Sequence, residues 1–185
     1  MPATATSDIK LRQAFEDHFD AVSRYCLRRL NPEDAREAVA QVFVVAWRKI
    51  DEMPGDGATL PWLYRIAFYE VGTIRRTTRR LIALRTRLNG QARPDNPGPE
   101  AIVVSNAERS AVIDALSTLS DTDREVILLR SFEELTIPEI AVATNCSEAA
   151  ARKRVDRAFA RLAKAAGLTA AGSEVEISHS RRARQ

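Results

Sequence analysis

The 185-residue sequence is poor in the residues on which disulfide scaffolds and metal sites depend. Its two cysteines, Cys26 and Cys146, lie far apart and form no CxxC pair, which excludes a disulfide scaffold or a zinc ribbon and favours a reducing cytoplasm. We expect neither cysteine to bind zinc or to form a disulfide. Because there are only two histidines, we expect no metal site and no other cofactor.

Long apolar runs are also missing. The longest, Val42 to Trp47, has six residues, whereas a membrane-spanning helix needs about 20. The first residues contain no basic region followed by an apolar stretch, so we expect no secretory signal and no membrane insertion. A nucleophile–base pair, a glycine-rich phosphate loop and metal-ligand spacing are absent too, which argues against an enzyme.

Acidic residues are absent from one long stretch of the chain. Residues 71–94 contain seven arginines and no acid, and residues 147–164 contain six basic residues against two acidic ones. Between them, residues 95–146 carry ten acidic and three basic residues. Two basic blocks separated by an acidic block predict two contacts with polyanions and an acidic face for some other partner.

The apolar residues recur at spacings of three and four, and no segment alternates like a strand, so the sequence predicts an all-α fold. Prolines and glycines gather between Asn89 and Pro99, which indicates an extended linker. We therefore predict two small helical domains, residues 1–88 and 102–166, joined by a flexible linker at residues 89–101. Residues 167–185 are expected to form a disordered tail.

The second domain contains the pattern of a helix-turn-helix. Thr136 begins a capping box before a short helix, a three-residue turn follows, and Ser147 is a suitable N-cap for a longer basic helix that ends near Lys164. One face of that helix should pack on the core: Ala151, Val155, Ala158, Phe159 and Leu162. The face expected to lie in a DNA major groove carries Ala149, Arg152, Lys153, Asp156 and Arg157.

The long basic helix of the first domain, from about residue 60 into the 80s, has two distinct faces. We expect Leu63, Ala67, Ile74 and Leu81 to face the core. The other face, which we expect to be exposed, carries Trp62, Arg65, Tyr69, Thr73, Arg76 and Arg80. Aromatic rings among arginines suit unstacked bases and the phosphates beside them. Trp62 and Tyr69 have an alternative interpretation as half-buried packing residues.

These two regions resemble a known family. Ala38 to Arg48 (AVAQVFVVAWR) and Pro61 to Ala67 (PWLYRIA), followed by an arginine-rich helix end, resemble the second conserved domain of bacterial sigma factors. Residues 116–162 resemble their fourth conserved domain. Since a short linker replaces any domain between them, the chain resembles the extracytoplasmic-function (ECF) class.

The resemblance implies a subunit that binds core RNA polymerase and directs it to promoter DNA, and it implies an anti-sigma factor as a further partner. The second helix would contact the polymerase clamp through Glu37, Ala40, Gln41, Val44 and Arg48. The −10 element would be opened and its non-template strand held by the long basic helix and by the loop residues Gly55, Asp56 and Gly57. The helix-turn-helix would read the −35 element as duplex.

A different class of protein shares part of this pattern. A transcription repressor with a helical N-terminal domain for dimerisation or ligand binding would also contain a helix-turn-helix. That alternative does not account for the acid-free stretch or for the aromatic rings placed among its arginines. The two hypotheses differ in a simple property, because a repressor binds duplex operator DNA alone whereas a sigma factor needs core polymerase.

Overall fold

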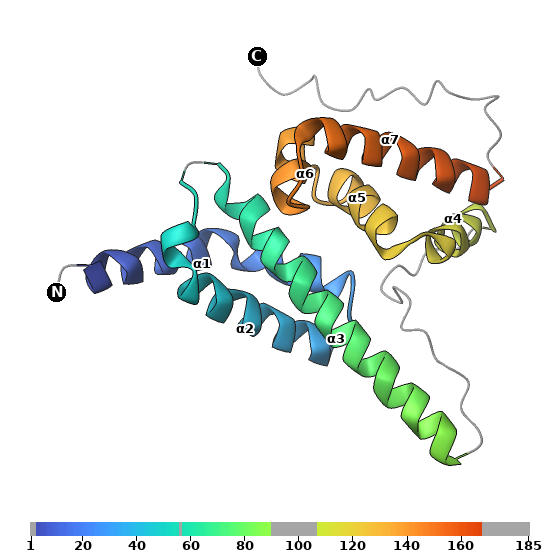
Figure 1. Cartoon of the computed structure of the whole chain (residues 1–185), viewed down its shortest axis with the longest axis horizontal. Coiled ribbons are helices and arrows are strands. Elements are labelled where there is room, and N and C mark those ends of the chain that lie inside the picture. The colour runs from blue at the N-terminus through green and yellow to red at the C-terminus, as the bar shows by residue number, and fades with distance from the viewer. Residues whose placement is uncertain (1–2, 56, 90–106, 168–185) are drawn as a thin grey trace.

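The computed structural model describes residues 3–55, 57–89 and 107–167, and all regular structure within these ranges is helical (Figure 1). The elements are α1 (Ala3–Leu27), α2 (Pro32–Arg48), the 3-10 turn η1 (Ile50–Glu52), α3 (Thr59–Asn89), α4 (Ala107–Thr118), α5 (Asp121–Ser131), α6 (Ile137–Ala143) and α7 (Glu148–Ala165). The predicted all-α fold is confirmed. Beyond Asn89, the predicted linker lies outside the described residues, as does the tail from residue 168 onward.

Helices α1, α2 and α3 form an N-terminal unit in which each helix packs on the other two. Helix α2 begins with a side-chain cap, because Asn31 accepts hydrogen bonds from the backbone N–H groups of Glu33 and Asp34, with Pro32 in the first turn. The core contains apolar residues from all three helices, among them Val22, Cys26, Ala38, Val42, Leu63 and Ala67.

Helix α3 is much longer than the unit that supports it. At 1.5 Å per residue its 31 residues span about 46 Å, and its second half projects beyond α1 and α2 (Figure 1). Leu63 is fully buried, whereas Leu81 is 53% exposed. The expectation that Leu81 faces the core is wrong, since α3 has left the supporting helices by that point.

Helices α4 to α7 form a C-terminal unit in which α5, α6 and α7 each begin with a side-chain cap, and those expected at Thr136 and Ser147 are confirmed. Ser120 caps α5, Thr136 and Glu139 form the capping box of α6, and Ser147 caps α7. In the turn before α7, Asn145 has a φ of 52°, a left-handed conformation that asparagine tolerates well. The chain thus forms a helix-turn-helix from α6 and α7.

The core face of α7 is close to the predicted one. Ala151, Val155 and Ala158 are buried, as expected. Phe159 is 37% exposed, so its assignment to the core is wrong. On the helical wheel Phe159 is the outermost of the five predicted core residues, and its ring therefore reaches solvent at the edge of the apolar face.

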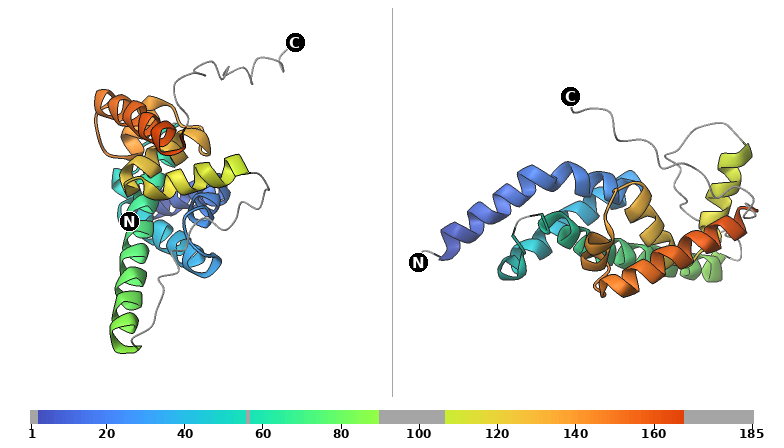
Figure 2. Two further views of the ribbon diagram at one scale, coloured as in Figure 1. Left: turned by 90° about the vertical axis from the view of Figure 1, so that its right-hand side faces the viewer. Right: turned by 90° about the horizontal axis from the view of Figure 1, so that it is seen from above.

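The two units pack against each other, chiefly through α3 and α6. Figure 2 shows from two further sides that the C-terminal unit lies against the N-terminal unit, and within it α7 packs on α5 and α6. Buried residues of both units, including Leu63, Leu129 and Ile140, belong to one continuous apolar cluster. Within the described ranges, no helix combines the length and the apolar character needed to cross a membrane.

Candidate nucleic-acid interface

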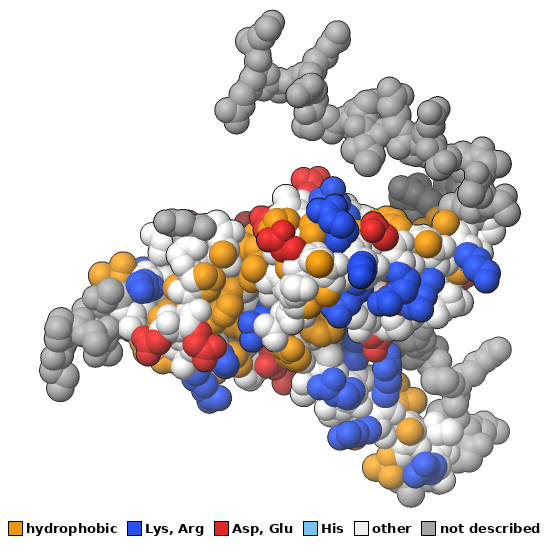
Figure 3. Space-filling model, turned by 45° about the horizontal axis from the view of Figure 1, so that its top comes forward, with side chains coloured by type: hydrophobic (Ala, Val, Ile, Leu, Met, Phe, Trp, Pro, Cys, Tyr) orange, Lys and Arg blue, Asp and Glu red, His pale blue; other side chains and the backbone are white. Residues whose placement is uncertain are grey.

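The outward face of α7 carries the residues predicted to meet duplex DNA. Ala149, Arg152, Lys153, Asp156 and Arg157 are all exposed, and basic side chains line this helix in Figure 3. Within the part of the chain that the structure describes, Arg152, Lys153 and Arg157 form no ion pair. Three cations on one helix face are therefore free to meet an anionic ligand.

A polar contact helps to fix α7 on its own unit. Arg161, which flanks the outward face, forms an ion pair with the buried carboxylate of Asp123 on α5. Burial acts to raise the pKa of Asp123, but hydrogen bonds with Arg161 and Ser120 outweigh it and hold that pKa below its ordinary value. The carboxylate is therefore charged near neutral pH and holds Arg161 against α5.

The predicted stripe on α3 is exposed along most of its length. Tyr69 is 53% exposed, Thr73, Arg76 and Arg80 are exposed, and Arg65 is half-buried. The Thr73 hydroxyl donates to the carbonyl oxygen of Tyr69 at 2.9 Å and accepts from Arg76 Nη2 at 3.0 Å. The Arg76 guanidinium is thereby held along the helix toward Thr73, on the face that also carries the exposed Tyr69.

Trp62 does not belong to this exposed stripe. Its side chain is only 6% exposed and is part of the apolar core. The expectation of an exposed Trp62 is wrong because this residue lies in the half of α3 that packs on the other helices. The alternative interpretation of Trp62 as a packing residue is the one that applies.

The loop before α3 stands clear of its surroundings. Gly55 and Gly57 are exposed, and a Cβ atom added at either position would meet no atom within 4 Å. Gly57 has a φ of 78°, which favours glycine. The Thr59 hydroxyl donates to the carbonyl oxygen of Pro54 at 2.9 Å and closes the loop. Asp56 lies outside the described residues.

An apolar groove of about 590 Å³ runs between α1 and α2. Its walls include the rings of Phe15 and Phe43, whose centroids lie 4.8 Å apart, and the partly exposed Trp47. Of the five residues predicted to contact polymerase, Ala40 and Val44 line this groove. The other three, Glu37, Gln41 and Arg48, are exposed on the same helix. An apolar patch with a polar border is typical of a protein–protein interface.

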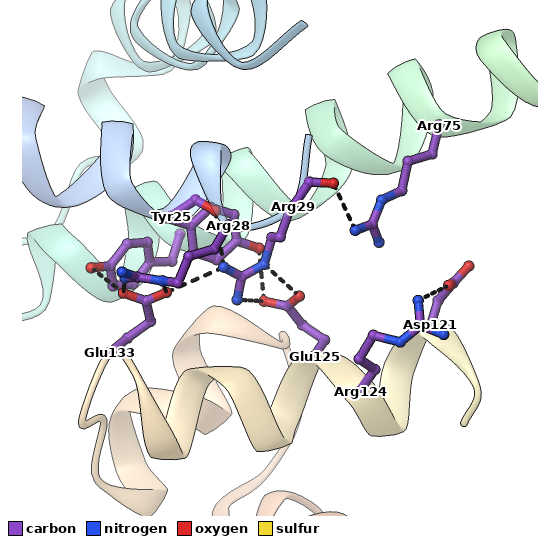
Figure 4. Close-up of polar contacts among 9 residues, drawn as sticks. Tyr25, Arg28, Arg29, Arg75, Asp121, Arg124, Glu125 and Glu133 are labelled. Atoms are coloured by element: carbon purple, nitrogen blue, oxygen red, sulfur yellow. Dashed lines mark hydrogen bonds and ion pairs between the residues drawn. The ribbon is translucent and has the colours of Figure 1, made fainter. Parts of the chain in front are cut away.

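A buried polar cluster joins the two units, and the sequence did not predict it (Figure 4). Arg29 is fully buried and donates to Glu125 through Nε at 2.9 Å and Nη2 at 3.0 Å. The Tyr25 hydroxyl donates to the same carboxylate at 2.7 Å. Glu133 accepts from Arg28 Nε and from Arg29 Nη1, each at 3.2 Å.

This cluster takes up part of the acidic block. We expected residues 95–146 to offer an acidic face to another partner, but Glu125 and Glu133 pair with arginines of the same chain. One signal for it was present in the sequence: Arg29 lies three residues after Cys26 and four after Tyr25, where the apolar face of α1 would continue by one more turn. A cation in that position requires a buried anion.

The two cysteines occupy the environments expected of them. Cys26 is buried in the core, and burial raises the pKa of its thiol to about 12. Cys146 is partly exposed in the turn before α7, with its sulfur 3.2 Å from Thr144 Oγ1. Among the described residues, no three histidine, cysteine or acidic side chains are grouped so that they could hold a metal ion.

Comparison with known proteins explains this arrangement. A family model described as sigma-70, region 4, matches residues 109–162. The RNA polymerase sigma factor NccH of Alcaligenes xylosoxydans xylosoxydans is 32% identical over 132 residues, which cover 70% of this chain and 71% of the relative. The ECF RNA polymerase sigma-E factor of Escherichia coli K12 is 31% identical over 145 residues and 74% of each chain. The chain belongs to the ECF sigma factors.

Solved structures show the same fold for this sigma factor. CnrH in complex with the cytosolic domain of CnrY matches with a TM-score of 0.57 and 24% identity, over 83% of this chain and 85% of that one. RpoE of Bartonella quintana, crystallised with the anti-sigma factor NepR, matches with a TM-score of 0.60 and 19% identity, over 85% and 97%. The family membership favours the sigma factor over the repressor, and it makes core RNA polymerase and promoter DNA its partners.

Proposed function

We propose that this sigma factor uses α7 to read the −35 element and α3 to hold the melted −10 strand while α2 binds core polymerase. The single observation that carries this proposal is the pair of exposed cationic faces, one on a helix-turn-helix and one beside an exposed aromatic ring. Each face suits one form of DNA. A rigid helix fits the groove of a duplex, whereas arginines beside an aromatic ring can bind the phosphates and bases of a single strand.

On α7, the three exposed cations would make two kinds of contact with DNA, to base edges and to phosphates. An arginine can donate two hydrogen bonds to guanine O6 and N7, whereas cations at the edge of the helix position it on phosphates. We assign these roles to Arg152, Lys153 and Arg157, with Ala149 and Asp156 beside them on the same exposed face. The ion pair between Arg161 and Asp123 keeps this face at a fixed angle to its unit.

On α3, Tyr69 would stack on an unpaired base, and Thr73, Arg76, Arg80 and the half-buried Arg65 would follow the adjoining backbone. Melting requires the protein to hold the separated strand more tightly than the duplex. The open loop at Gly55 and Gly57 lies immediately before α3 and would close over a base that leaves the stack. Trp62 has no part in this surface because it is buried.

The polymerase clamp would occupy the groove between α1 and α2. Ala40 and Val44 line the groove, and Glu37, Gln41 and Arg48 supply polar contacts on the same helix. CnrH and the Bartonella RpoE were each solved with a second protein, the latter with an anti-sigma factor. We propose that an anti-sigma factor likewise restrains this chain in the cytoplasm, and that the chain itself catalyses no reaction.

Run-off transcription on a library of genomic promoters with purified core polymerase tests the proposal. We expect transcripts from a limited set of promoters that share upstream and downstream elements, and no transcripts without the protein. A gel shift with the same promoters provides the control for the repressor hypothesis. Sequence-specific binding of duplex DNA by the chain alone, together with no promoted transcription, would overturn the proposal.

A further inference from the structure

The face of the N-terminal unit that the C-terminal unit covers is strongly basic. Arg28 and Arg29 follow the end of α1, and Arg75 lies on the neighbouring face of α3 (Figure 4 shows these three), with the exposed Arg79 one turn further along α3. Arg75 Nη2 donates to the backbone carbonyl oxygen of Arg29 at 2.8 Å, which places these two side chains together. Three arginines that the C-terminal unit covers, with the exposed Arg79 at their edge, therefore form one cationic surface, which we call the covered arginine surface.

The groups that neutralise this surface come from the other unit. Glu125 pairs with Arg29, Glu133 with Arg28 and Arg29, and Asp121 lies 3.6 Å from Arg79. In the described part of the chain, no buried side-chain nitrogen or oxygen lacks a hydrogen-bond partner. The carboxylates thus occupy positions that another set of anionic oxygens could take.

The covered arginine surface is organised within the N-terminal unit itself. Arg29 Nη1 donates to the carbonyl oxygen of Tyr25 at 3.0 Å, and its guanidinium lies 3.5 Å from the centroid of the Tyr25 ring. That ring stacks on Tyr64 at 5.0 Å. Because all of these partners lie on α1 or α3, they would hold the guanidinium in place after the C-terminal unit moved away.

The polar part of the contact between the units does little to keep the contact closed. Burying charges removes them from water, and the ion pairs formed in return often contribute little net stability. When the units separate, Arg29, Glu125 and Glu133 regain that hydration. Burial also lowers the pKa of Arg75, with the nearby charge of Arg124 acting in the same direction. The covered surface is therefore crowded with positive charge even when it is closed.

We propose that the covered arginine surface is a second binding site for nucleic-acid phosphates, which Glu125 and Glu133 occupy while the two units are together. Arg75 and Arg79 adjoin the exposed Arg76 and Arg80 on the same helix, so the surface continues the acid-free stretch of α3. This continuity favours a long polyanion such as a DNA strand over an acidic protein. The proposal goes beyond the promoter contacts above, and its test needs no polymerase.

Two matched double variants of the full chain test the site. Glu125→Gln with Glu133→Gln should separate the units, and Asp114→Asn with Glu134→Gln changes the charge equally at exposed acids of the same unit. The measurements are small-angle X-ray scattering for separation and fluorescence anisotropy with a labelled oligo-dT strand for binding. Each phosphate contact adds about 0.7 to the slope of log affinity against log salt concentration. When the units separate, Arg28, Arg29 and Arg75 become available to phosphates. The slope should therefore become steeper by about 2 in the first variant and stay unchanged in the control variant.

Several results would overturn the proposal. The first variant remaining compact, or opening without a steeper slope, would show that the glutamates do not mask a phosphate site. An equally steeper slope in the control variant would show that the change in net charge, and not the exposure of the arginines, causes the effect. Adding Arg29→Gln and Arg75→Gln to the first variant should bring the slope back to within about 0.7 of the wild-type value, because only Arg28 remains of the three arginines, whereas adding Lys10→Gln and Arg12→Gln should not.

A second measurement on the wild-type chain covers the case in which the first variant fails to fold. Saturating oligo-dT should expand the wild-type protein in scattering, because phosphates would displace Glu125 and Glu133. No expansion would contradict the site, and equal expansion with a polyglutamate peptide of the same charge would assign the surface to an acidic protein instead. Run-off transcription by the wild-type chain does not depend on either scattering result. It therefore tests the proposed promoter function independently of the proposed phosphate site.

Discussion

The two basic helices, α3 and α7, carry similar charge but are supported differently. α7 rests on its unit along the face that carries Ala151, Val155 and Ala158, and its outward cations are exposed. α3 is buried only in its first half, and its arginines divide between an exposed stripe and the face that meets the C-terminal unit. Charge alone thus does not determine what a basic helix can bind.

The different packing of α7 and α3 suits two forms of DNA, the duplex and the single strand. Reading base edges in a duplex requires a helix held in one register, and α7 has buried contacts and an ion pair to provide it. A single strand has no fixed groove and is held by stacking and by phosphates along a flexible track. The exposed face of α3 has that form, since Tyr69 lies on it in the first half and arginines continue along the second half.

The largest effect we predict compares the two halves of α3. Leu63→Ala removes a fully buried side chain and should lower the free energy of unfolding by about 2–5 kcal/mol. Leu81→Ala makes the same chemical change at a 53% exposed position and should change it by less than about 0.5 kcal/mol. Urea unfolding followed by circular dichroism measures both. Equal losses would mean that the projecting half of α3 has a core of its own.

The second prediction concerns α7. Replacing an arginine that makes a two-bond contact with guanine should cost about 1–3 kcal/mol and relax the preferred −35 sequence, whereas replacing a phosphate contact weakens all sequences alike. We expect Arg152, Lys153 and Arg157 to fall into these two groups when each is changed to alanine. Binding of the polymerase holoenzyme to a randomised upstream library measures preference and affinity together. A triple alanine variant that selects the same upstream sequence would refute the assignment.

The third prediction concerns the exposed ring on α3. Tyr69→Ala should leave −35 binding intact and impair open-complex formation, because stacking on one base is worth about 1–3 kcal/mol. Permanganate reactivity of thymines in the −10 element reports melting. Tyr69→Phe keeps the ring and should retain most of the reactivity. Equal reactivity in the wild-type and Tyr69→Ala complexes would remove Tyr69 from the mechanism.

The loop before α3 should act at the same stage as Tyr69. Replacing residues 55–58 with a sequence that lacks glycine should slow opening, since Gly57 adopts a positive φ that other residues rarely tolerate. A promoter with a premelted bubble should recover much of the activity if the loop acts mainly in melting. Equal defects on premelted and duplex promoters would instead indicate a general loss of binding.

Local features of the fold could be predicted from the sequence, because each is encoded within a few residues. Thr136 and Ser147 cap the helices that they were expected to begin, and the buried positions Ala151, Val155 and Ala158 of α7 follow from its apolar spacing. The exposed stripe at Tyr69, Thr73, Arg76 and Arg80 was predicted for the same reason. A helical wheel needs only the position of a residue within its own helix.

Features that depend on distant segments could not be predicted in this way. Trp62 is buried and Leu81 exposed because the surroundings of α3 change along its length, and a wheel treats all turns alike. The pairing of Arg29 with Glu125 joins residues 96 positions apart. Periodicity within one helix says that a buried cation needs an anion, but not which acid of the chain provides it.

The smallest predicted effect tests how far the support of α7 depends on its neighbour α6. The Thr136 hydroxyl and Glu139 carboxylate form the capping box of α6, with the Thr136 N–H donating to Glu139 Oε2 at 2.7 Å. Thr136→Ala should therefore lower the free energy of unfolding by about 1 kcal/mol. Thr77→Ala, at an exposed position inside α3, is the matched control and should not destabilise the protein. Because α6 packs on α7, the cap variant should weaken −35 binding near the unfolding temperature and leave it unchanged well below. A loss of −35 binding at low temperature would mean that the cap positions α7 directly.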